Sequence, residues 1–479
     1  MPRETDQNLI GSARRRFEQL RSAKPARPLS FCEIVDRFRA VQDEYRDLDF
    51  LDPGGTLDIR TRITGVVTIR IELPKVEYLH LASVLIESDD FTDPAKHAEI
   101  SVSSTWEAYR DALESGLLFE PDNRDLAVHT KRDNRPWMEI TLDRPTDIRR
   151  VVLRNRNDAR SVRARGIQVL ARTEDGQWTT LYDGLIRERQ FTHAVERHYA
   201  TRSLANKAAS ALKLGTTTPR TPADHLSTIP DPATAADLTR LLTAIRLQDL
   251  ANVQSDFRNL DLSDDARQEL KTLINSDLLR PRNLEWSTHG IRKTFRFWSL
   301  EEKQHYIDFS LSVIESLRLL NEHVCFGFGS VLSIVRDHDL IPHDDDLDVI
   351  IAFEPDQAST LADALSLVRS HLNQDGFSAF GSSAANLNIR DREHFKKLDV
   401  FVGIFEGESI AWYPGRRGSL TRAMVFPPAS QDLLGRPCPI PRDAESYLHE
   451  LYGDGWKTPD PNFHHQFGKR KAEYGSIQG

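Results

Sequence analysis

Apolar and polar residues alternate with the two-residue period of β-strands between about Leu57 and Ala200. The longest run is Leu57–Ile71. Shorter runs follow, with turn residues between them: Tyr78–Ile86, Trp137–Leu142, Ile148–Arg156, Ile167–Ala171 and Trp178–Tyr182. Several short strands separated by turns are typical of two packed antiparallel sheets. We therefore predict an antiparallel β-sandwich over residues 51–204.

The pattern changes on both sides of this sandwich. Ile34, Phe38 and Val41 recur at helical spacing, whereas Gly215–Pro222 is a run of threonine, proline and glycine typical of linkers. Two further helical patterns come after the linker, either as a bridge to the last domain or as its first helices. The predicted segments are an N-terminal helical segment at 1–50, a linker at 205–235 and a helical bridge at 236–298.

The remaining residues, 299–479, mix both periods. Ser299 and Glu302 have the spacing of a capping box and predict a helix to about Asn321. Its buried stripe is expected to contain Tyr306, Phe309, Val313, Leu317 and Leu320. A second helix is predicted over Pro355–Asn373, and strands over Phe377–Phe380, Asn386–Arg390 and Lys397–Phe405. The chain is thus predicted to be an α+β multidomain protein with a mixed α/β domain at its C-terminal end.

Within this domain, the stretch Val324–Ile351 concentrates the candidate chemistry. An apolar strand over Val324–Phe328 stops at Gly329-Ser330, and Ser330 can cap a short helix that runs to about Asp337. The free N–H groups at such a helix start favour a phosphate. Gly329 and Ser330 are therefore candidate substrate-binding residues.

Four carboxylates follow in the same stretch: Asp344, Asp345, Asp346 and Asp348. Strand alternation would place Asp344, Asp346 and Asp348 on one side, and Asp345 and Leu347 on the other. Oxygen ligands that point the same way suit Mg²⁺ or Mn²⁺. A solvated acidic loop is the alternative, but the neighbouring strand is apolar, which favours the metal site.

Three residues outside this stretch are also candidates. Asp399 lies inside the apolar strand Leu398–Val402, where a carboxylate is costly unless it is paired or bound to metal; the alternative is a residue that caps a turn. Its role would be third metal ligand or general base. Arg336 and Lys397 are candidate phosphate contacts, with a surface ion pair and a solvated strand start as the alternatives.

This order of motifs resembles the LicD family, which belongs to the nucleotidyltransferase fold of the polymerase-β superfamily. The matching residues are Gly329–Arg336, Leu340–Asp348 and the closing Tyr452-Gly453-Asp454-Gly455-Trp456. The chain has Ser330 where the family usually has threonine, and His343 where it usually has tryptophan. Physically, Gly453 is expected to end a helix and Trp456 to anchor the tail.

The resemblance implies a metal-dependent transferase. It would move a phospho-alcohol group, such as phosphocholine, ribitol phosphate or glycerol phosphate, from a CDP-linked donor to a glycan acceptor. Asp346, Asp348 and Asp399 would be catalytic, and Asp344 would join them as a metal ligand. Two alternatives use the same residues differently: a nucleotidyltransferase that releases pyrophosphate, and a glycan-binding protein with a vestigial site.

The predicted sandwich resembles the discoidin (coagulation factor 5/8 type C) jelly roll. The resemblance rests on Ser103–Trp106, Trp137–Leu142 and Val151–Arg156, and the family's terminal cysteine pair is missing. Such domains often bind sugars through loops at one end. Trp106 and Trp137 could stack on a sugar, although burial in the core is the favoured interpretation for both.

Composition limits the remaining possibilities. A formal net charge of −9 without a basic stripe gives no attraction to nucleic acid, so no nucleic-acid partner is expected. Three distant cysteines argue against a disulfide framework and for a reducing compartment. The polar N-terminus has no signal-peptide pattern, and no apolar run is long enough to span a membrane. We therefore expect a soluble, cytoplasmic protein.

Overall fold

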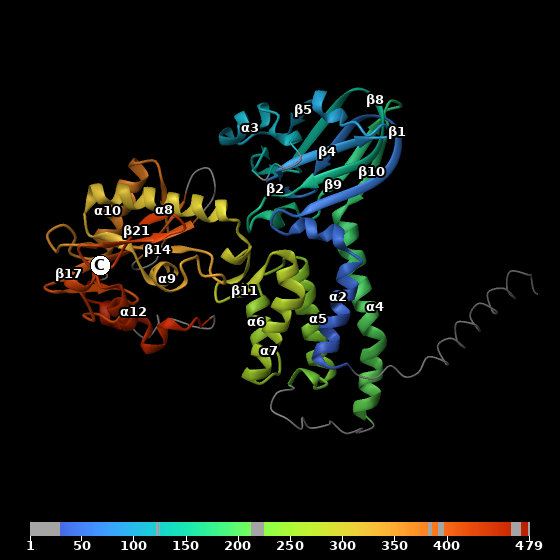
Figure 1. Ribbon diagram of the computed structural model, residues 1–479. Coiled ribbons are helices and arrows are strands. Elements are labelled where there is room, and N and C mark those ends of the chain that lie inside the picture. The colour runs from blue at the N-terminus through green and yellow to red at the C-terminus, as the bar shows by residue number, and fades with distance from the viewer. Residues whose placement is uncertain are drawn as a thin grey trace, which may run out of the picture. The chain divides into compact units, whose positions relative to one another are not determined.

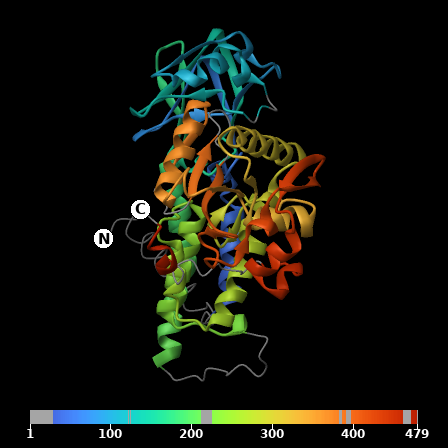
Figure 2. The ribbon, with the colours of Figure 1, turned by 90° about the vertical axis from the view of Figure 1, so that its left-hand side faces the viewer.

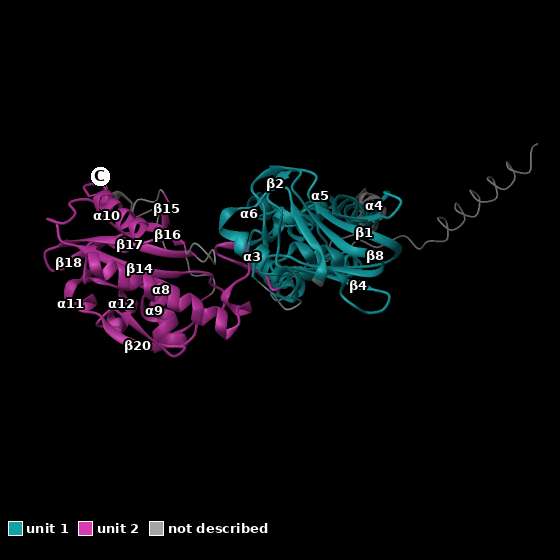
Figure 3. Ribbon diagram, turned by 90° about the horizontal axis from the view of Figure 1, so that it is seen from above, with its two compact units in different colours: residues 1–282 teal, residues 283–479 magenta. Residues whose placement is uncertain are grey.

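The computed structural model describes residues 29–120, 123, 125–211, 225–381, 386–390, 397–460 and 471–477. The chain folds into two compact units, residues 1–282 and 283–479 (Figures 1 and 3). Among the described residues, no helix combines the length and apolarity that crossing a bilayer requires. The predicted bridge at 236–298 is divided between the units, because its helices belong to the first and residues from Asn283 onward to the second.

Unit 1 is built around a six-stranded sheet whose strands all pair antiparallel. Two long strands form its centre, β1 (Thr56–Glu72) and β8 (Trp137–Arg154), and they pair from Thr56 opposite Arg154 to Glu72 opposite Trp137. The other strands of the sheet are β4 (Ser83–Ser88), β5 (Glu99–Val102), β9 (Gln168–Thr173) and β10 (Trp178–Asp183). Short pairs complete the unit: β2 (Val76–Glu77) with β7 (Asp133–Asn134), and β3 (His80–Leu81) with β6 (Val128–His129). The predicted antiparallel β-structure is confirmed.

The end of the predicted sandwich is corrected. Strand structure stops at Asp183, and Gly184–Ala211 is a single helix, α4. Glu188, Phe191 and Val195 are buried at helical spacing, and the Phe191 ring packs against Phe38. Buried positions that follow one another after three and then four residues lie on one face of a helix, whereas those of a strand follow every second residue. The helix also occupies the start of the predicted linker, whose residues 212–224 lie outside the described part of the chain.

Helices make up the rest of unit 1. α2 (Phe31–Asp43) confirms the helical prediction for the N-terminal segment, whose residues 1–28 lie outside the described part. Ser30 and Glu33 form a capping box that starts it. α2 packs beside α4, and the two run side by side in Figures 1 and 2. The other helices are α3 (Arg110–Glu114), α5 (Pro232–Arg246), α6 (Val253–Arg258) and α7 (Asp264–Ile274).

Unit 2 contains a seven-stranded mixed sheet, as predicted for this domain. Its main path runs β13–β14–β17–β16–β15, and β18 and β19 extend it from β17. Only the central pair, β14 with β17, is parallel among the pairs that the structure describes in this sheet. The strands are β13 (Val324–Phe326), β14 (Leu347–Phe353), β15 (Ser378–Phe380), β16 (Asn386–Arg390), β17 (Lys397–Glu406), β18 (Ser409–Trp412) and β19 (Leu420–Thr421). Two hairpins lie outside the sheet: β11 (Glu285–Ser287) with β12 (Gly290–Arg292), and β20 (Ala429–Leu433) with β21 (Arg436–Ile440).

The helices of unit 2 start and stop where local signals place them. α8 (Leu300–Leu320) begins with the predicted Ser299–Glu302 capping box. α10 (Leu361–Gln374) begins later than predicted, because Thr360 and Asp363 form its capping box. α12 (Ala444–Tyr452) ends at Gly453, whose φ is 75°. Trp456 is buried behind it, as predicted. The remaining helices are α9 (Phe328–Leu332), which continues as a π-helical turn over Ser333–Asp337, and α11 (Arg422–Val425).

The two faces of this sheet are covered by different helices. Val349 and Ile351 of β14 belong to the core under α8 and α10, whereas Ile350 and Ala352 belong to the core under α9 and α12. Because side chains alternate along a strand, Asp348 points to the α9 and α12 face. This face carries the candidate site.

Candidate active site

The turn between β13 and α9 is packed too closely for side chains. The predicted strand Val324–Phe328 ends early, at Phe326, and Gly327 becomes the N-cap of α9. A Cβ atom at Gly327 would lie 2.4 Å from Cγ2 of Ile350, so only glycine fits against β14. Phe328 then has φ 44°, which is uncommon for a residue with a side chain, and its N–H donates to the Tyr447 hydroxyl at 3.0 Å. The packing of Gly327 against Ile350 and the hydrogen bond from Phe328 to Tyr447 therefore both fix the position of this turn.

Gly329 lies directly against the acidic residues. A Cβ atom there would be 3.5 Å from Oδ2 of Asp344 and 3.6 Å from Oδ2 of Asp348. These two carboxylate oxygens therefore point into the same space beside the Gly329 backbone. The predicted association of the glycine turn with the carboxylates is present in the structure.

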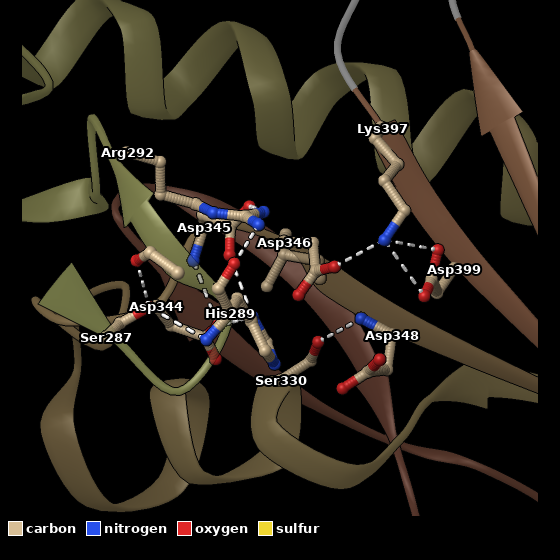
Figure 4. Close-up of polar contacts among 12 residues, drawn as sticks. Ser287, His289, Arg292, Ser330, Asp344, Asp345, Asp346, Asp348, Lys397 and Asp399 are labelled. Carbon is tan, nitrogen blue, oxygen red and sulfur yellow. Dashed lines mark hydrogen bonds and ion pairs between the residues drawn. The ribbon is translucent and has the colours of Figure 1, made fainter. Parts of the chain in front are cut away.

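Ser330 does not have the predicted role of helix cap. It lies inside α9, whose N-cap is Gly327, and it is buried. Its Oγ accepts a hydrogen bond from the N–H of Asp348 at 2.6 Å. The prediction failed because the N-cap is Gly327, three residues before Ser330. Ser330 thus fixes the backbone that carries Asp348 (Figure 4).

The predicted alternation of the carboxylates is also corrected. β14 begins at Leu347, so Asp344, Asp345 and Asp346 lie in the loop that leads into it, and only Asp348 is a strand residue. Asp399 of β17 is the register partner of Asp348. Since parallel partners point to the same face, these two carboxylates lie side by side. The structure brings together Asp344, Asp346, Asp348 and Asp399, with Asp344 and Asp346 on a loop instead of on the strand of Asp348.

Lys397 joins two members of this cluster. Its Nζ lies 2.8 Å from Oδ2 of Asp346 and 3.1 Å from Oδ1 of Asp399. Lys397 is two residues before Asp399 on β17, so both side chains leave the same face of the strand. The lysine predicted as a phosphate contact is therefore at the site, bound to carboxylates.

Two asparagines that the sequence analysis missed hold Asp399 in place. Nδ2 of Asn388 donates to Oδ1 of Asp399 at 2.7 Å, and Nδ2 of Asn386 lies 3.4 Å from Oδ2. Both come from β16, where polar Asn386 and Asn388 alternate with buried Leu387 and Ile389. That alternation is the signal that could have identified them.

Asp345 differs from the other carboxylates of the loop in forming ion pairs with His289 and Arg292. Its Oδ1 accepts from Nδ1 of His289 at 2.8 Å, and its Oδ2 lies 2.5 Å from Nη1 of Arg292. Both cations come from the β11–β12 hairpin, which the sequence analysis assigned to the helical bridge (Figure 4). No motif in that segment pointed to the site.

Burial and mutual repulsion dominate the electrostatics of the cluster. Desolvation, followed by the charge of Asp346, raises the pKa of Asp344 to about 7 and that of Asp399 to about 6, and raises the pKa of Asp348 well above its usual value. Burial also acts on Asp345, but hydrogen bonds and charges from His289 and Arg292 lower its pKa overall. The protein alone does not compensate the negative charge at Asp344, Asp348 and Asp399.

These carboxylates fit a divalent cation. Among the described residues, no donor contacts the Asp348 carboxylate, which is half-buried and faces Asp344 and Asp399. A desolvated carboxylate without a hydrogen-bond donor is costly, and a bound cation would remove that cost. Carboxylate oxygens from Asp344, Asp346, Asp348 and Asp399 are the ligand type that Mg²⁺ and Mn²⁺ prefer.

Arg336 has a different set of partners from the one expected. Its Nε and Nη2 each lie 2.8 Å from the Asp337 carboxylate, and its Nη1 donates to the carbonyl of Trp456 at 3.0 Å. The side chain is only 10% exposed. These contacts favour a structural role, in which Arg336 attaches the C-terminal tail to the end of the α9 segment.

Tyr306 of α8 links β14 and β17, the two strands that carry Asp348 and Asp399. Its hydroxyl donates to the carbonyl of Lys397 and accepts from the N–H of Leu347 at 2.8 Å. These two residues are the first of β17 and β14. Tyr306 was predicted only as part of a buried stripe, and it also sets where both strands begin.

Unit 2 thus combines a mixed sheet with carboxylates at the start of two adjacent parallel strands and a glycine turn beside them. Residues 321–443 match the family described as LicD/FKTN/FKRP, nucleotidyltransferase domain. The chain thus carries a LicD domain, which confirms the resemblance seen in its motifs. Residues 122–202 match a second family, NedA-like, galactose-binding domain, which confirms the discoidin-type resemblance of unit 1.

No curated protein matches the chain. Two solved structures of the antibiotic-resistance factor ANT(2″)-Ia are similar to part of it, one of them in complex with adenylyl-2″-tobramycin. Both are 11% identical with a TM-score of 0.24, and the alignments cover 36% and 37% of this chain and 86% of the matched chains.

Proposed function

We propose that this protein is a metal-dependent transferase that moves a phospho-alcohol group from a CDP-activated donor to a glycan hydroxyl. The observation that carries the proposal is the in-register pair Asp348 and Asp399, completed by Asp344 and Asp346, inside a LicD domain. Transfer of a phosphoryl-type group depends mainly on positioning and on neutralising charge, and this cluster is built for both.

The protein's own residues account for donor placement. Asp344, Asp346, Asp348 and Asp399 would hold Mg²⁺ or Mn²⁺, which when bound neutralises the diphosphate and stabilises the charge of the leaving nucleotide. Gly329 leaves open space beside these carboxylates, since a side chain there would extend toward Asp344 and Asp348. Lys397 supplies a further positive charge at the opposite edge, where it contacts Asp346 and Asp399.

The proposed reaction forms one P–O bond and breaks another. The acceptor hydroxyl oxygen bonds to the phosphorus that carries the alcohol, the bond from this phosphorus to the bridging oxygen breaks, and CMP leaves with the electron pair. The hydroxyl proton passes to a base. Asp399 suits either proposed role, base or metal ligand, because Asn388 and Lys397 orient its carboxylate toward the cluster.

The test is nucleotide release from a panel of CDP-linked alcohols, namely choline, ribitol and glycerol, in the presence of Mg²⁺ or Mn²⁺. We expect CMP from one donor, with loss of at least about 100-fold in Asp348→Asn and complete loss in chelator. The matched control is Asp356→Asn, which removes an exposed aspartate of the same unit and should retain full activity.

The main competitor uses the same residues to transfer a nucleoside monophosphate. Its product is pyrophosphate from a nucleoside triphosphate, so the two activities are separated by the product alone. Pyrophosphate release without CMP release from any donor would replace the proposed function. A vestigial site would give neither product and would bind no divalent cation.

A second function, glycan binding by unit 1, is favoured by a specific observation. Trp106 is 44% exposed, which corrects the expectation that it belongs to the core, and Trp137 is half-buried. The Trp106 ring lies 5.8 Å from that of Tyr78, over which the Arg163 guanidinium stacks at 4.6 Å. An exposed aromatic face beside a polar group suits a sugar ring. This arrangement supports the carbohydrate binding that we propose for unit 1, and the NedA-like match supports the jelly-roll fold that we also propose for it.

Glycan-array binding of the full chain tests this second function. Trp106→Ala should abolish binding, whereas Trp178→Ala, which removes a tryptophan of similar exposure (42%), should not. Equal binding by both variants, or no binding by the wild type across neutral and acidic glycans, would exclude it.

We also propose that the protein acts in the cytoplasm, where thiols stay reduced. Cys325 and Cys438 are buried thiols, and burial raises the pKa of both. Cell fractionation with a tagged full-length chain checks this, and recovery in a secreted or periplasmic fraction would contradict it.

A further inference from the structure

The hairpin formed by β11 and β12 delivers an imidazole to the acidic loop. Ser287 pairs with Gly290 across the hairpin, so Thr288 and His289 form its two-residue turn. Nδ1 of His289 lies 2.8 Å from Oδ1 of Asp345 and 3.6 Å from Oδ1 of Asp344. The side chain of His289 is 46% exposed, so its free edge faces solvent.

The position of this turn is fixed by its own hydrogen bonds. The N–H of His289 donates to Oγ of Ser287 at 3.1 Å, and Arg292 donates to the carbonyl of His289 while its Nη1 pairs with Asp345. At the base of the hairpin, buried Glu285 accepts from Thr294. The imidazole is therefore held at this place by the fold.

The chain following the hairpin is attached to the acidic loop itself. The N–H of Phe295 donates to the carbonyl of Asp344, and the N–H of Arg296 donates to that of Pro342, both at 2.9 Å. The hairpin and the acidic loop must therefore move together. Yet residues 285–296 precede the region that matches the LicD family, which starts at 321.

The ligand atoms of His289, Asp344, Asp345 and Asp346 all lie within 4.8 Å of one another. An octahedral ion with bonds of about 2.1 Å holds neighbouring ligand atoms about 3 Å apart and opposite atoms about 4.2 Å apart. The distances from Nδ1 of His289 to Oδ1 of Asp345, 2.8 Å, and to Oδ1 of Asp344, 3.6 Å, are close to these values. In addition, Oδ2 of Asp344 and Oδ2 of Asp348, whose carboxylate no described donor contacts, both lie within 3.6 Å of the place that a Cβ atom would take at Gly329.

We propose that His289 is a metal ligand, which together with Asp344, Asp345 and Asp346 forms a mixed nitrogen and oxygen site at the edge of the carboxylate cluster. The inference rests on the proposed function only in its premise that the cluster binds a divalent cation. Arg292 holds the second oxygen of Asp345 and is a positioning residue, because it keeps the first oxygen turned to the site.

A nitrogen ligand changes which ion the site prefers. Mg²⁺ takes oxygen ligands and keeps much of its water, whereas first-row transition-metal ions accept imidazole. The site should therefore bind Mn²⁺ more tightly than Mg²⁺, and His289 should be the source of that preference. Without it, the remaining carboxylates still bind both ions.

The test uses Mn²⁺ itself as the probe on the full-length protein. Pulsed electron paramagnetic resonance detects the ¹⁴N coupling of a bound imidazole, and a titration of free Mn²⁺ gives the affinity, with competition by Mg²⁺. We expect the ¹⁴N coupling in the wild type and its loss in His289→Gln, with Mn²⁺ affinity about 10-fold lower and Mg²⁺ affinity nearly unchanged. His305→Gln, which removes an exposed histidine of α8, is the control and should match the wild type.

The assignment would be overturned by Mn²⁺ bound to the wild type without ¹⁴N coupling, by coupling that persists in His289→Gln, or by equal losses of Mn²⁺ and Mg²⁺ affinity. Failure to bind Mn²⁺ would do the same. CMP release is measured separately on the same proteins. CMP release with no ¹⁴N coupling leaves the proposed function standing and removes His289 as a ligand, whereas coupling without CMP release from any donor does the reverse.

Discussion

Asp348 and Asp399 lie directly opposite each other in the parallel register of β14 and β17. Each belongs to a strand whose other residues on the sheet are mostly buried and apolar. Two carboxylates at neighbouring strand positions repel, and neither strand can shift by one residue without moving its buried side chains from one packed face of the sheet to the other. The apolar core thus holds two like charges together that would otherwise separate.

The protein should gain stability when Asp348 loses its charge. Burial and the neighbouring carboxylates raise the pKa of Asp348 well above its usual value, so the ionised form destabilises the fold. In chelator at neutral pH, Asp348→Asn should increase the free energy of unfolding by on the order of 1 kcal/mol or more. Urea unfolding measures this, with Asp356→Asn as the unchanged control. A less stable Asp348→Asn protein would contradict the electrostatic account.

Stability of the metal-free protein should fall as pH rises. Asp344 and Asp399 have pKa values of about 7 and about 6, above those of an unfolded chain, so the folded state binds more protons. The free energy of unfolding therefore decreases from about pH 4 to about pH 7, and the stabilisation by these groups is complete only below the unfolded pKa. Urea unfolding in chelator across this range should show the decrease, and Asp344→Asn with Asp399→Asn should flatten it. Added Mn²⁺ should also flatten it, since a bound cation favours the ionised carboxylates.

Lys397 should matter most when no cation is bound. Its ammonium group lies between Asp346 and Asp399. Burial lowers its pKa, but these two carboxylates raise it by more, so that the pKa is raised overall. We expect Lys397→Gln to lower the free energy of unfolding by about 1 kcal/mol in chelator, a value reduced by the partial exposure of the side chain. Lys457→Gln removes a more exposed lysine and serves as control. If the loss were equally large with saturating Mn²⁺, Lys397 would have a structural role independent of the cluster.

Ser330 should be needed for its hydroxyl oxygen. Ser330→Ala leaves the N–H of Asp348 without its acceptor in a buried place, which typically costs about 1–3 kcal/mol. The same change should reduce CMP release by displacing Asp348. Ser330→Thr, the residue usual in the family, retains the oxygen and should restore activity. Ser312→Ala, which removes an exposed hydroxyl on α8, is the control for stability.

The sequence was sufficient where short-range patterns decide the structure. Asp344, Asp346, Asp348 and Asp399, which the structure brings together, could be selected as candidates because carboxylates next to apolar strands are rare and costly. The predicted α8 capping box and the helix end at Gly453 were confirmed, because both depend only on neighbours within a few residues.

Contacts between distant residues were beyond such patterns. His289 and Asp345 are 56 positions apart, and nothing near either residue indicates the other. Ser330 was predicted as the helix cap because serine is a common cap residue. In the structure the helix begins earlier in the chain, at Gly327, which packs closely against the distant residue Ile350. The error at α4 was similar, because its burial depends on Phe38 from another helix.

The hydroxyl of Tyr306 has a practical consequence for anyone who shortens this protein. It connects the first residues of β14 and β17, yet it lies on α8, ahead of the region that defines the family. A fragment that starts at residue 321 would contain the four aspartates of the cluster but would lack Tyr306 and the β11–β12 hairpin. The smallest fragment worth expressing for chemistry therefore begins at Asn283, where the second compact unit begins.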